Sequence, residues 1–129
     1  NGMGGQGVQN IYNGTSVGGP GIESKVVSTT FATNNNIGEV TNGKLYFCGG
    51  GSANSSDQTI PGGGGGGNGD ANTGGGGQGE GFGGAGGSGI VFIKAKEDTD
   101  ITTTGTVVTE TADGIKTYCF KTSGTITFN

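Results

Sequence analysis

The chain has 129 residues, of which 34 are glycine, and hydrophobic residues make up only 28% of it. A length near this value predicts a single domain, and so little apolar volume excludes a helical bundle or a doubly wound α/β core. Histidine and arginine are missing, and 10 acidic residues against 6 lysines leave a net charge of −4. This composition disfavours histidine-based catalysis, most zinc sites and nucleic-acid binding.

The first half of the chain has two segments before its glycine-rich part. Residues 1–22 are punctuated by glycine and begin with Asn1, so we expect a mature product or a piece of a larger polypeptide. Residues 23–48 predict strands, because residues 24–33 are rich in Val, Thr and Phe. No apolar run is long enough to cross a bilayer, and we expect no membrane insertion.

A hairpin is predicted within residues 39–47. The pair Asn42-Gly43 separates two apolar-containing stretches and is a strong signal for a two-residue turn. With that turn Val40 faces Leu45, and Phe47 lies on the same side of the hairpin. One face of this hairpin is therefore expected to be apolar.

Residues 49–89 form the third segment, and about half of them are glycine. Collagen is excluded because a strict triplet period and abundant proline are both missing. A flexible linker is an alternative, although charged residues make up only 12% of the chain and apolar stretches flank the glycines. Holding a glycine in one conformation costs roughly 0.5–1 kcal/mol more than holding an alanine, so an ordered segment needs a compensating interaction.

Backbone hydrogen bonds between glycine runs would supply that compensation. An extended helix of the polyproline II type has no internal hydrogen bonds, so its N–H and C=O groups point toward neighbouring chains. We expect the runs 62–67, 74–77 and 83–89 to stack side by side in this way. The glycines assigned this structural role are Gly62, Gly63, Gly64, Gly65, Gly66, Gly67, Gly74, Gly75, Gly76, Gly77, Gly86, Gly87 and Gly89.

The fourth segment, residues 90–129, predicts only strands. Residues 90–94 form one short strand, and the Asp113-Gly114 turn joins two more. After Ser123-Gly124, residues 125–128 are expected to complete a three-stranded meander. No window has helical periodicity. The predicted fold is all-β with irregular parts: stacked polyglycine helices of the polyproline II type flanked by short antiparallel strands and hairpins, with essentially no α-helix.

Motifs that carry chemistry are weak in this chain. Gly-x-Gly-x-x-Gly spacings recur, but in a segment this rich in glycine they reflect composition, and no helix follows them. A serine or cysteine nucleophile would have no histidine partner. We therefore expect no enzyme, no cofactor and no metal site.

Two cysteines, Cys48 and Cys119, each lie in an apolar and aromatic stretch. The simpler interpretation is a pair of small buried side chains. The alternative is a disulfide, which would imply an oxidising compartment, and spacing alone does not decide between the two.

Ligand recognition would have to come from the polar segments that join the glycine runs, because glycine offers only backbone groups. These segments carry amide and carboxylate side chains, and one aromatic ring follows them. An alternative interpretation is that these are turn residues that tolerate positive φ. The candidate receptor-binding residues are Asn54, Asp57, Gln58, Asn68, Asp70, Asn72 and Phe82.

Glycine runs that end in Gly-Gly-Ser-Gly at 86–89, followed by the β-branched strand 90–94, resemble the glycine-rich domain of bacteriophage tail-fibre and other virion structural proteins. Residues 5–10 and 118–128 are similar to further segments of these proteins, whereas residues 23–48 match none. The resemblance implies a stacked polyglycine sandwich in a distal tail adhesin whose end loops contact host receptors. It also implies a virion or extracellular location.

The resemblance implies partners as well. They are other copies of the chain or other fibre proteins, and a host cell-surface receptor that is a protein or a polysaccharide. The strands that usually open such a domain stand last here. We therefore expect either one period of a tandem array or a piece whose strands complete a neighbouring subunit.

Functions of different classes remain open at this stage. The first is a virion tail-fibre or tip domain that displays receptor-binding loops. The second is a self-assembling extracellular fibre or surface filament subunit that binds only copies of itself. A third, an ice-binding protein, is disfavoured because a regular Gly-x-x period and a uniform Thr or Ala face are missing from the sequence.

Overall fold

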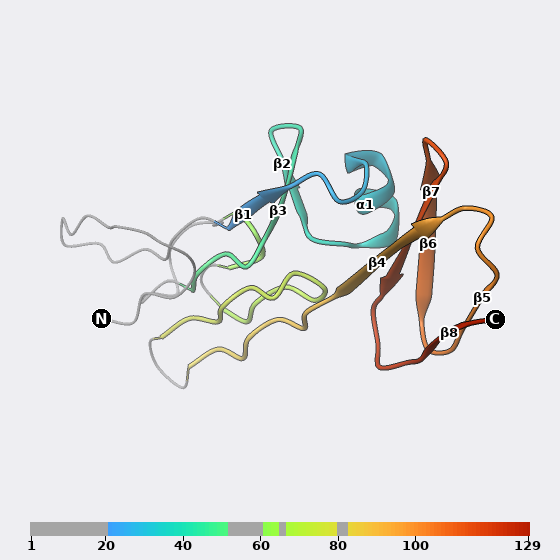
Figure 1. The fold of residues 1–129 in the computed structure, drawn as a ribbon. Helices are drawn as coiled ribbons and strands as arrows, with labels where there is room; N and C mark the ends of the chain where they lie inside the picture. The colour runs from blue at the N-terminus through green and yellow to red at the C-terminus, as the bar shows by residue number, and fades with distance from the viewer. Residues whose placement is uncertain (1–20, 52–60, 65–66, 80–82) are drawn as a thin grey trace. The chain divides into compact units, whose positions relative to one another are not determined.

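The structure is a computed structural model, and it describes residues 21–51, 61–64, 67–79 and 83–129. The chain divides into two compact units, residues 1–89 and residues 90–129 (Figure 1). A single domain was expected, and the boundary coincides with the end of the last glycine run. Backbone hydrogen bonds stabilise stacked glycines, whereas apolar side chains stabilise the C-terminal strands, so each part forms its own network of contacts.

The described residues form three antiparallel sheets and one short helix, which confirms the all-β class with essentially no α-helix. The first unit contains one sheet and the helix, and the second contains two sheets. The elements are β1 (Ile22–Ser24), α1 (Thr29–Asn35), β2 (Glu39–Thr41), β3 (Lys44–Phe47), β4 (Val91–Lys96), β5 (Ile101–Thr103), β6 (Val107–Ala112), β7 (Ile115–Phe120) and β8 (Ile126–Phe128).

The sheet of the first unit has the order β1-β3-β2. The predicted hairpin is confirmed, because Val40 pairs with Leu45 across a two-residue turn. The turn residues Asn42 and Gly43 have φ of 52° and 74°, the left-handed values that a type I′ turn requires. Leu45 is fully buried and lies at the centre of this sheet.

The strand predicted over residues 24–33 is wrong, because only Ser24 belongs to a strand, β1, and the chain forms α1 from Thr29 onward. Ser28 caps the helix, since its side chain accepts a hydrogen bond from the N–H of Phe31 at 3.2 Å. Asn36 ends the helix with φ of 52°, and the N–H of Ile37 then donates to the carbonyl of Ala32. These caps, together with the burial of Ala32 and Ile37, outweigh the strand preference of Thr and Phe.

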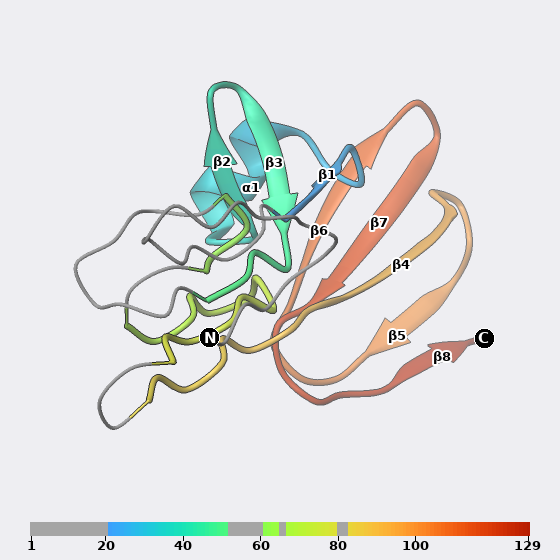
Figure 2. The same ribbon diagram turned by 90° about the vertical axis from the view of Figure 1, so that its left-hand side faces the viewer.

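The larger sheet of the second unit has the order β4-β7-β6, as Figure 2 shows. The predicted strand after residue 89 is confirmed as β4, and the predicted turn Asp113-Gly114 joins β6 to β7 with φ of 52° and 74°. The central strand β7 is the most buried, with Cys119 fully covered and Tyr118 and Phe120 nearly so.

The predicted meander is wrong, because β8 pairs with β5 and not with β7. β5 leads into β6 and β7 leads into β8, so the four strands form one antiparallel ribbon that bends between its two halves (Figure 2). Gly124 lies at the bend, where a Cβ would overlap the carbonyl oxygen of Thr104. This close approach of two backbones is possible because Gly124 has no side chain. It brings β8 beside β5, with which it pairs.

Candidate functional site

The described glycine runs are joined by backbone hydrogen bonds, as the sequence predicted, but the run 49–51, which was not part of that prediction, joins 62–64 to 74–77. The N–H of Gly49 donates to the carbonyl of Gly62 at 2.9 Å, and the N–H of Gly76 donates to the carbonyl of Gly49 at 2.8 Å. The N–H of Gly87 donates to the carbonyl of Gly75 at 2.7 Å. Four separate runs of the chain therefore form one glycine lattice, which we define as the described residues of 49–51, 62–64, 74–77 and 83–89.

The run at 62–67 is not a uniform polyproline II helix, which corrects the prediction for it. Gly62, Gly63 and Gly67 have φ of +106°, +82° and +131°, far from the value near −75° of that helix. The other two runs also depart from it at their first residue, since Gly74 and Gly83 have φ of +68° and +71°. Gly62 and Gly63 belong to a turn that starts at Pro61. Gly65 and Gly66 lie outside the described residues.

A carboxylate joins the β2–β3 hairpin to this turn. Oε2 of Glu39 accepts hydrogen bonds from the N–H groups of Gly62 at 2.9 Å and Gly63 at 2.8 Å. Oε1 of the same side chain accepts from the hydroxyl of Thr41 at 2.9 Å. Successive N–H groups in a left-handed turn form a concavity that binds anions, and here Glu39 fills it. Sequence reasoning missed this role of Glu39, and the only signal for it was the Gly-Gly pair after Pro61.

Two of the predicted receptor-binding residues are exposed on a segment that lies alongside the glycine runs, where the N–H of Gly69 donates to the carbonyl of Ala85. Asn68 accepts a hydrogen bond from the N–H of Ala85 at 3.0 Å and remains exposed. Asp70 is also exposed, while its backbone N–H donates to Gly63 and its carbonyl accepts from the hydroxyl of Thr73. Both side chains are therefore accessible to a partner. Four further candidates lie outside the described residues: Asn54, Asp57, Gln58 and Phe82.

Asn72, in contrast, is 7% exposed and points into the first unit. Its side-chain amide donates to the carbonyl of Asn36 at 2.9 Å, and its carbonyl accepts from the N–H of Gly38 at 3.0 Å. Its own N–H donates to the hydroxyl of Ser88 at 2.9 Å. These bonds connect the end of α1 to the glycine lattice, so Asn72 has a structural role and is not available as a recognition residue.

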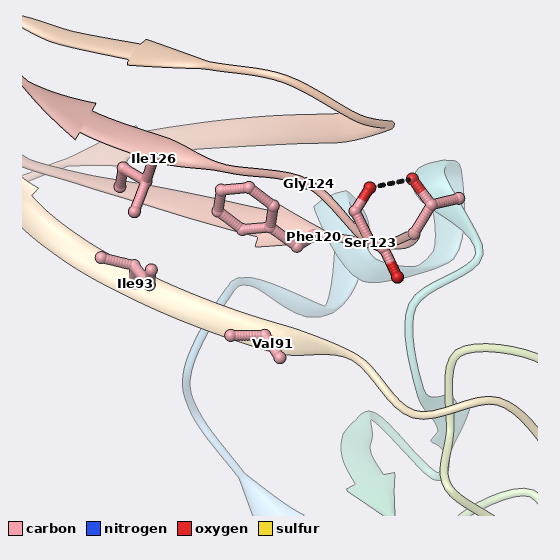
Figure 3. A pocket seen from close by; sticks show the side chains of 7 residues that line it. Val91, Ile93, Phe120, Ser123, Gly124 and Ile126 are labelled. Carbon is pink, nitrogen blue, oxygen red and sulfur yellow. Dashed lines mark hydrogen bonds between the residues drawn. The ribbon is translucent and has the colours of Figure 1, made fainter.

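A second candidate site is an apolar pocket of about 300 Å³ in the unit 90–129 (Figure 3). Val91 and Ile93 of β4 lie on one side of it, and Ile126 of β8 lies on the other. Phe120 of β7 and the bend at residues 122–124 complete the lining. The volume is at the lower limit of small-molecule pockets, and its lining suits an apolar side chain or ring.

Lys94 of β4 and Thr117 of β7, which face each other across the three-stranded sheet, do not form a reactive centre. The ammonium of Lys94 donates to the hydroxyl of Thr117 at 2.8 Å, an arrangement that could in principle activate a nucleophile. However, Thr117 is only 3% exposed, so a substrate cannot reach its hydroxyl. The pair instead satisfies a buried polar group on the central strand.

Both cysteines are free thiols in the structure. Cys119 is fully buried, as the simpler interpretation expected, whereas Cys48 is exposed, which corrects that interpretation for this residue. Burial raises the pKa of the Cys119 thiol to about 11, with a smaller contribution from the carboxylate of Glu110. A thiol with this pKa stays protonated and unreactive at neutral pH.

Within the described part of the chain, no three His, Cys, Asp or Glu side chains group closely enough to hold a metal ion. No helix among the described residues is long and apolar enough to span a membrane. No protein-family model matches the chain, and the search of curated proteins and of solved structures found no match either.

Proposed function

We propose that this chain is a structural display domain of a virion tail fibre or tip, built to present polar loops to a host surface. The observation that carries the proposal is the glycine lattice, in which separate runs are held by backbone hydrogen bonds. Such a lattice provides a rigid support, and among its residues only Ala85 and Ser88 carry side chains, so it offers almost no groups for catalysis. The resemblance of the glycine runs to tail-fibre domains supports the same function.

The contact surface in this proposal is the exposed part of the segment beside the glycine lattice that bears Asn68 and Asp70. Both side chains are exposed there, and amide and carboxylate groups together offer the donors and acceptors that a polysaccharide or a protein loop requires. The polar segment that carries Asn54, Asp57 and Gln58 belongs to the same proposal by sequence. Asn72 no longer does, because its side chain is engaged inside the unit.

Adsorption of the labelled chain to a panel of bacterial cells tests this function. We expect a combined Asp57→Ala, Gln58→Ala, Asn68→Ala and Asp70→Ala variant to lose at least about tenfold in affinity, or about 1.4 kcal/mol of binding free energy. The matched control replaces the exposed Thr109 and Thr111 of β6 with alanine, and circular dichroism verifies that both variants are folded. Equal adsorption of the combined variant and the parent would overturn the assignment of the contact surface.

The alternative function, a self-assembling filament subunit, makes a different prediction for the same material. The parent chain would adsorb to none of the cells, and negative-stain images of the native particle would show a long uniform filament. A tail tip in those images, together with adsorption to at least one strain, supports the display function.

A further inference from the structure

β8 is an edge strand whose only protection against pairing with another chain is its length of three residues. Among the described residues it pairs with β5 alone. Residues 124–129 carry no charge and no proline, and Thr125, Ile126, Thr127 and Phe128 all favour strands. Natural edge strands are usually kept very short or carry lysine, proline or a bulge. The longer edge strand β4 carries Lys94 and Lys96, whereas β8 is short but has no lysine, proline or bulge.

The apolar face of β8 is also incompletely covered. Ile126 lines the pocket, while Phe128, two residues further along the same face, is 59% exposed. Across the pocket, Val91 is 58% exposed. Figure 3 shows that the pocket lies between β8 and β4, so the opening is flanked by two edge strands. A strand added at this edge would place apolar side chains over Ile126 and toward Val91.

We propose that β8 pairs antiparallel with β8 of a second copy of this chain, across a two-fold axis that passes beside Thr127. In this register Thr127 faces Thr127 of the second copy, and Ile126 faces the second copy's Phe128. Cross-strand neighbours have Cβ atoms about 4.5–5.5 Å apart, so each Phe128 ring covers the pocket that the other copy's Ile126 lines. The two short sheets merge into one with the order β5-β8-β8-β5.

The partner at the β8 edge is a second copy of the chain because the sequence of β8 is complementary to itself. The symmetric register matches apolar with apolar residues on the inner face, and it matches Thr125 with Asn129 on the outer face. No charge is buried or opposed in this pairing, whereas β4 paired in the same way would bring lysines near each other. A two-stranded sheet of three-residue strands is also only marginally stable by itself, and the pairing converts it into a four-stranded sheet.

The contact is isologous, so it produces a closed dimer and not a filament. The β8–β8 contact gives the proposed display domain a surface for self-association, and the dimer forms without a receptor. A contact this small predicts a weak dimer, with a dissociation constant on the order of micromolar to millimolar. Weak pairing of this kind becomes effective when copies are held together in a larger particle.

Sedimentation of the full chain over a concentration series tests the dimer. We expect the parent to change from monomer to dimer, and Thr127→Lys, which opposes two charges at the axis, to raise the dissociation constant at least about tenfold. Thr102→Lys is the matched control, since Thr102 pairs with Thr127 on the same outward face but lies on β5. A parent that stays monomeric up to about millimolar concentration, or equal effects of the two lysines, would overturn the proposal.

Cross-linking tests the register. In a background in which Cys48 is replaced by serine, Thr127→Cys places two thiols opposite each other and should give a disulfide-linked dimer on mild oxidation. Thr102→Cys in the same background is the control and should cross-link much more slowly. Equal rates would contradict the β8–β8 register. Because neither assay uses cells, its result is independent of the adsorption experiment that tests the proposed function.

Discussion

Oε2 of Glu39 accepts a hydrogen bond of 2.8 Å from the backbone N–H of Gly63, a residue 24 positions further along the chain. The same oxygen accepts from Gly62, and Oε1 accepts from Thr41. The carboxylate therefore connects the hairpin of the first unit to the turn that begins the longest glycine run. Hydrogen bonds to a charged group are worth more than neutral ones, about 1.5–3 kcal/mol each.

The first prediction concerns this contact. Glu39→Gln removes the charge but keeps the shape of the side chain, and we expect it to lower the free energy of unfolding by about 1–3 kcal/mol. Glu23→Gln is the control, because Glu23 forms an exposed ion pair with Lys44 at 3.2 Å, and its loss should change stability by less than about 1 kcal/mol. Urea denaturation measures the free energy of unfolding of both variants. Equal denaturation midpoints would show that the Glu39 contact contributes little to stability.

The second prediction separates two glycines of the lattice. A Cβ at Gly64 would overlap the carbonyl oxygen of Gly50, whereas a Cβ at Gly86 would meet only the carbonyl oxygen of Gly75 at 3.6 Å. We expect Gly64→Ala to destabilise the chain by about 1–3 kcal/mol because backbone must move. Gly86→Ala should be neutral, or stabilising by up to about 1 kcal/mol, because it restricts the unfolded chain.

Thermal unfolding of the two alanine variants provides the measurement. A similar loss of melting temperature in both would mean that the lattice excludes side chains everywhere, and no loss in either would contradict the tight packing at Gly64. Gly89, which was also expected to be structural, has open space around its Cβ position and should behave like Gly86.

The third prediction distinguishes two asparagines that the sequence analysis grouped together. Asn72→Ala removes the buried amide that donates to the carbonyl of Asn36 and places alanine at φ of 60°. We expect a loss of about 1–3 kcal/mol in stability. Asn68→Ala acts at an exposed position and should cost less than about 1 kcal/mol. Chemical denaturation of each single variant decides this, and a larger loss for Asn68→Ala would reverse the assignment of the two roles.

The fourth prediction concerns the thiols. At pH 8 a thiol reagent should modify the exposed Cys48 and leave Cys119 untouched, because burial raises the pKa of Cys119 from 9.0 to about 11. In the unfolded chain the thiol ionises near pH 9, while in the folded chain it keeps its proton. The stability that this group contributes is therefore present below pH 9 and is lost as the pH rises toward 11.

Comparison of the parent with Cys119→Ala isolates this contribution, since the variant lacks the titrating group but retains the other ionisable residues. The parent should lose more stability than the variant between pH 9 and pH 11. Rapid modification of both thiols at pH 8 in the folded chain would show that Cys119 is accessible.

The features that local sequence determined are those in which a residue's own conformational preference decides the outcome. Asn42-Gly43 and Asp113-Gly114 form the predicted turns because these residues accept the positive φ that a tight hairpin needs. The side-by-side glycine runs were also predictable, because without side chains only backbone hydrogen bonds can hold them in an ordered structure. The all-β class follows from the same composition of glycine and β-branched residues.

Only the tertiary structure decided where segments with conflicting or weak preferences go. α1 forms over a sequence that favours strands because Ser28 and Asn36 cap it and its own residue Ala32 is buried. The partner of β8 is β5 because the backbones approach closely at Gly124, a contact between residues far apart in the chain. The inward position of Asn72 and the Glu39 contact likewise depend on partners distant in sequence, and periodicity and composition carry no information about such partners.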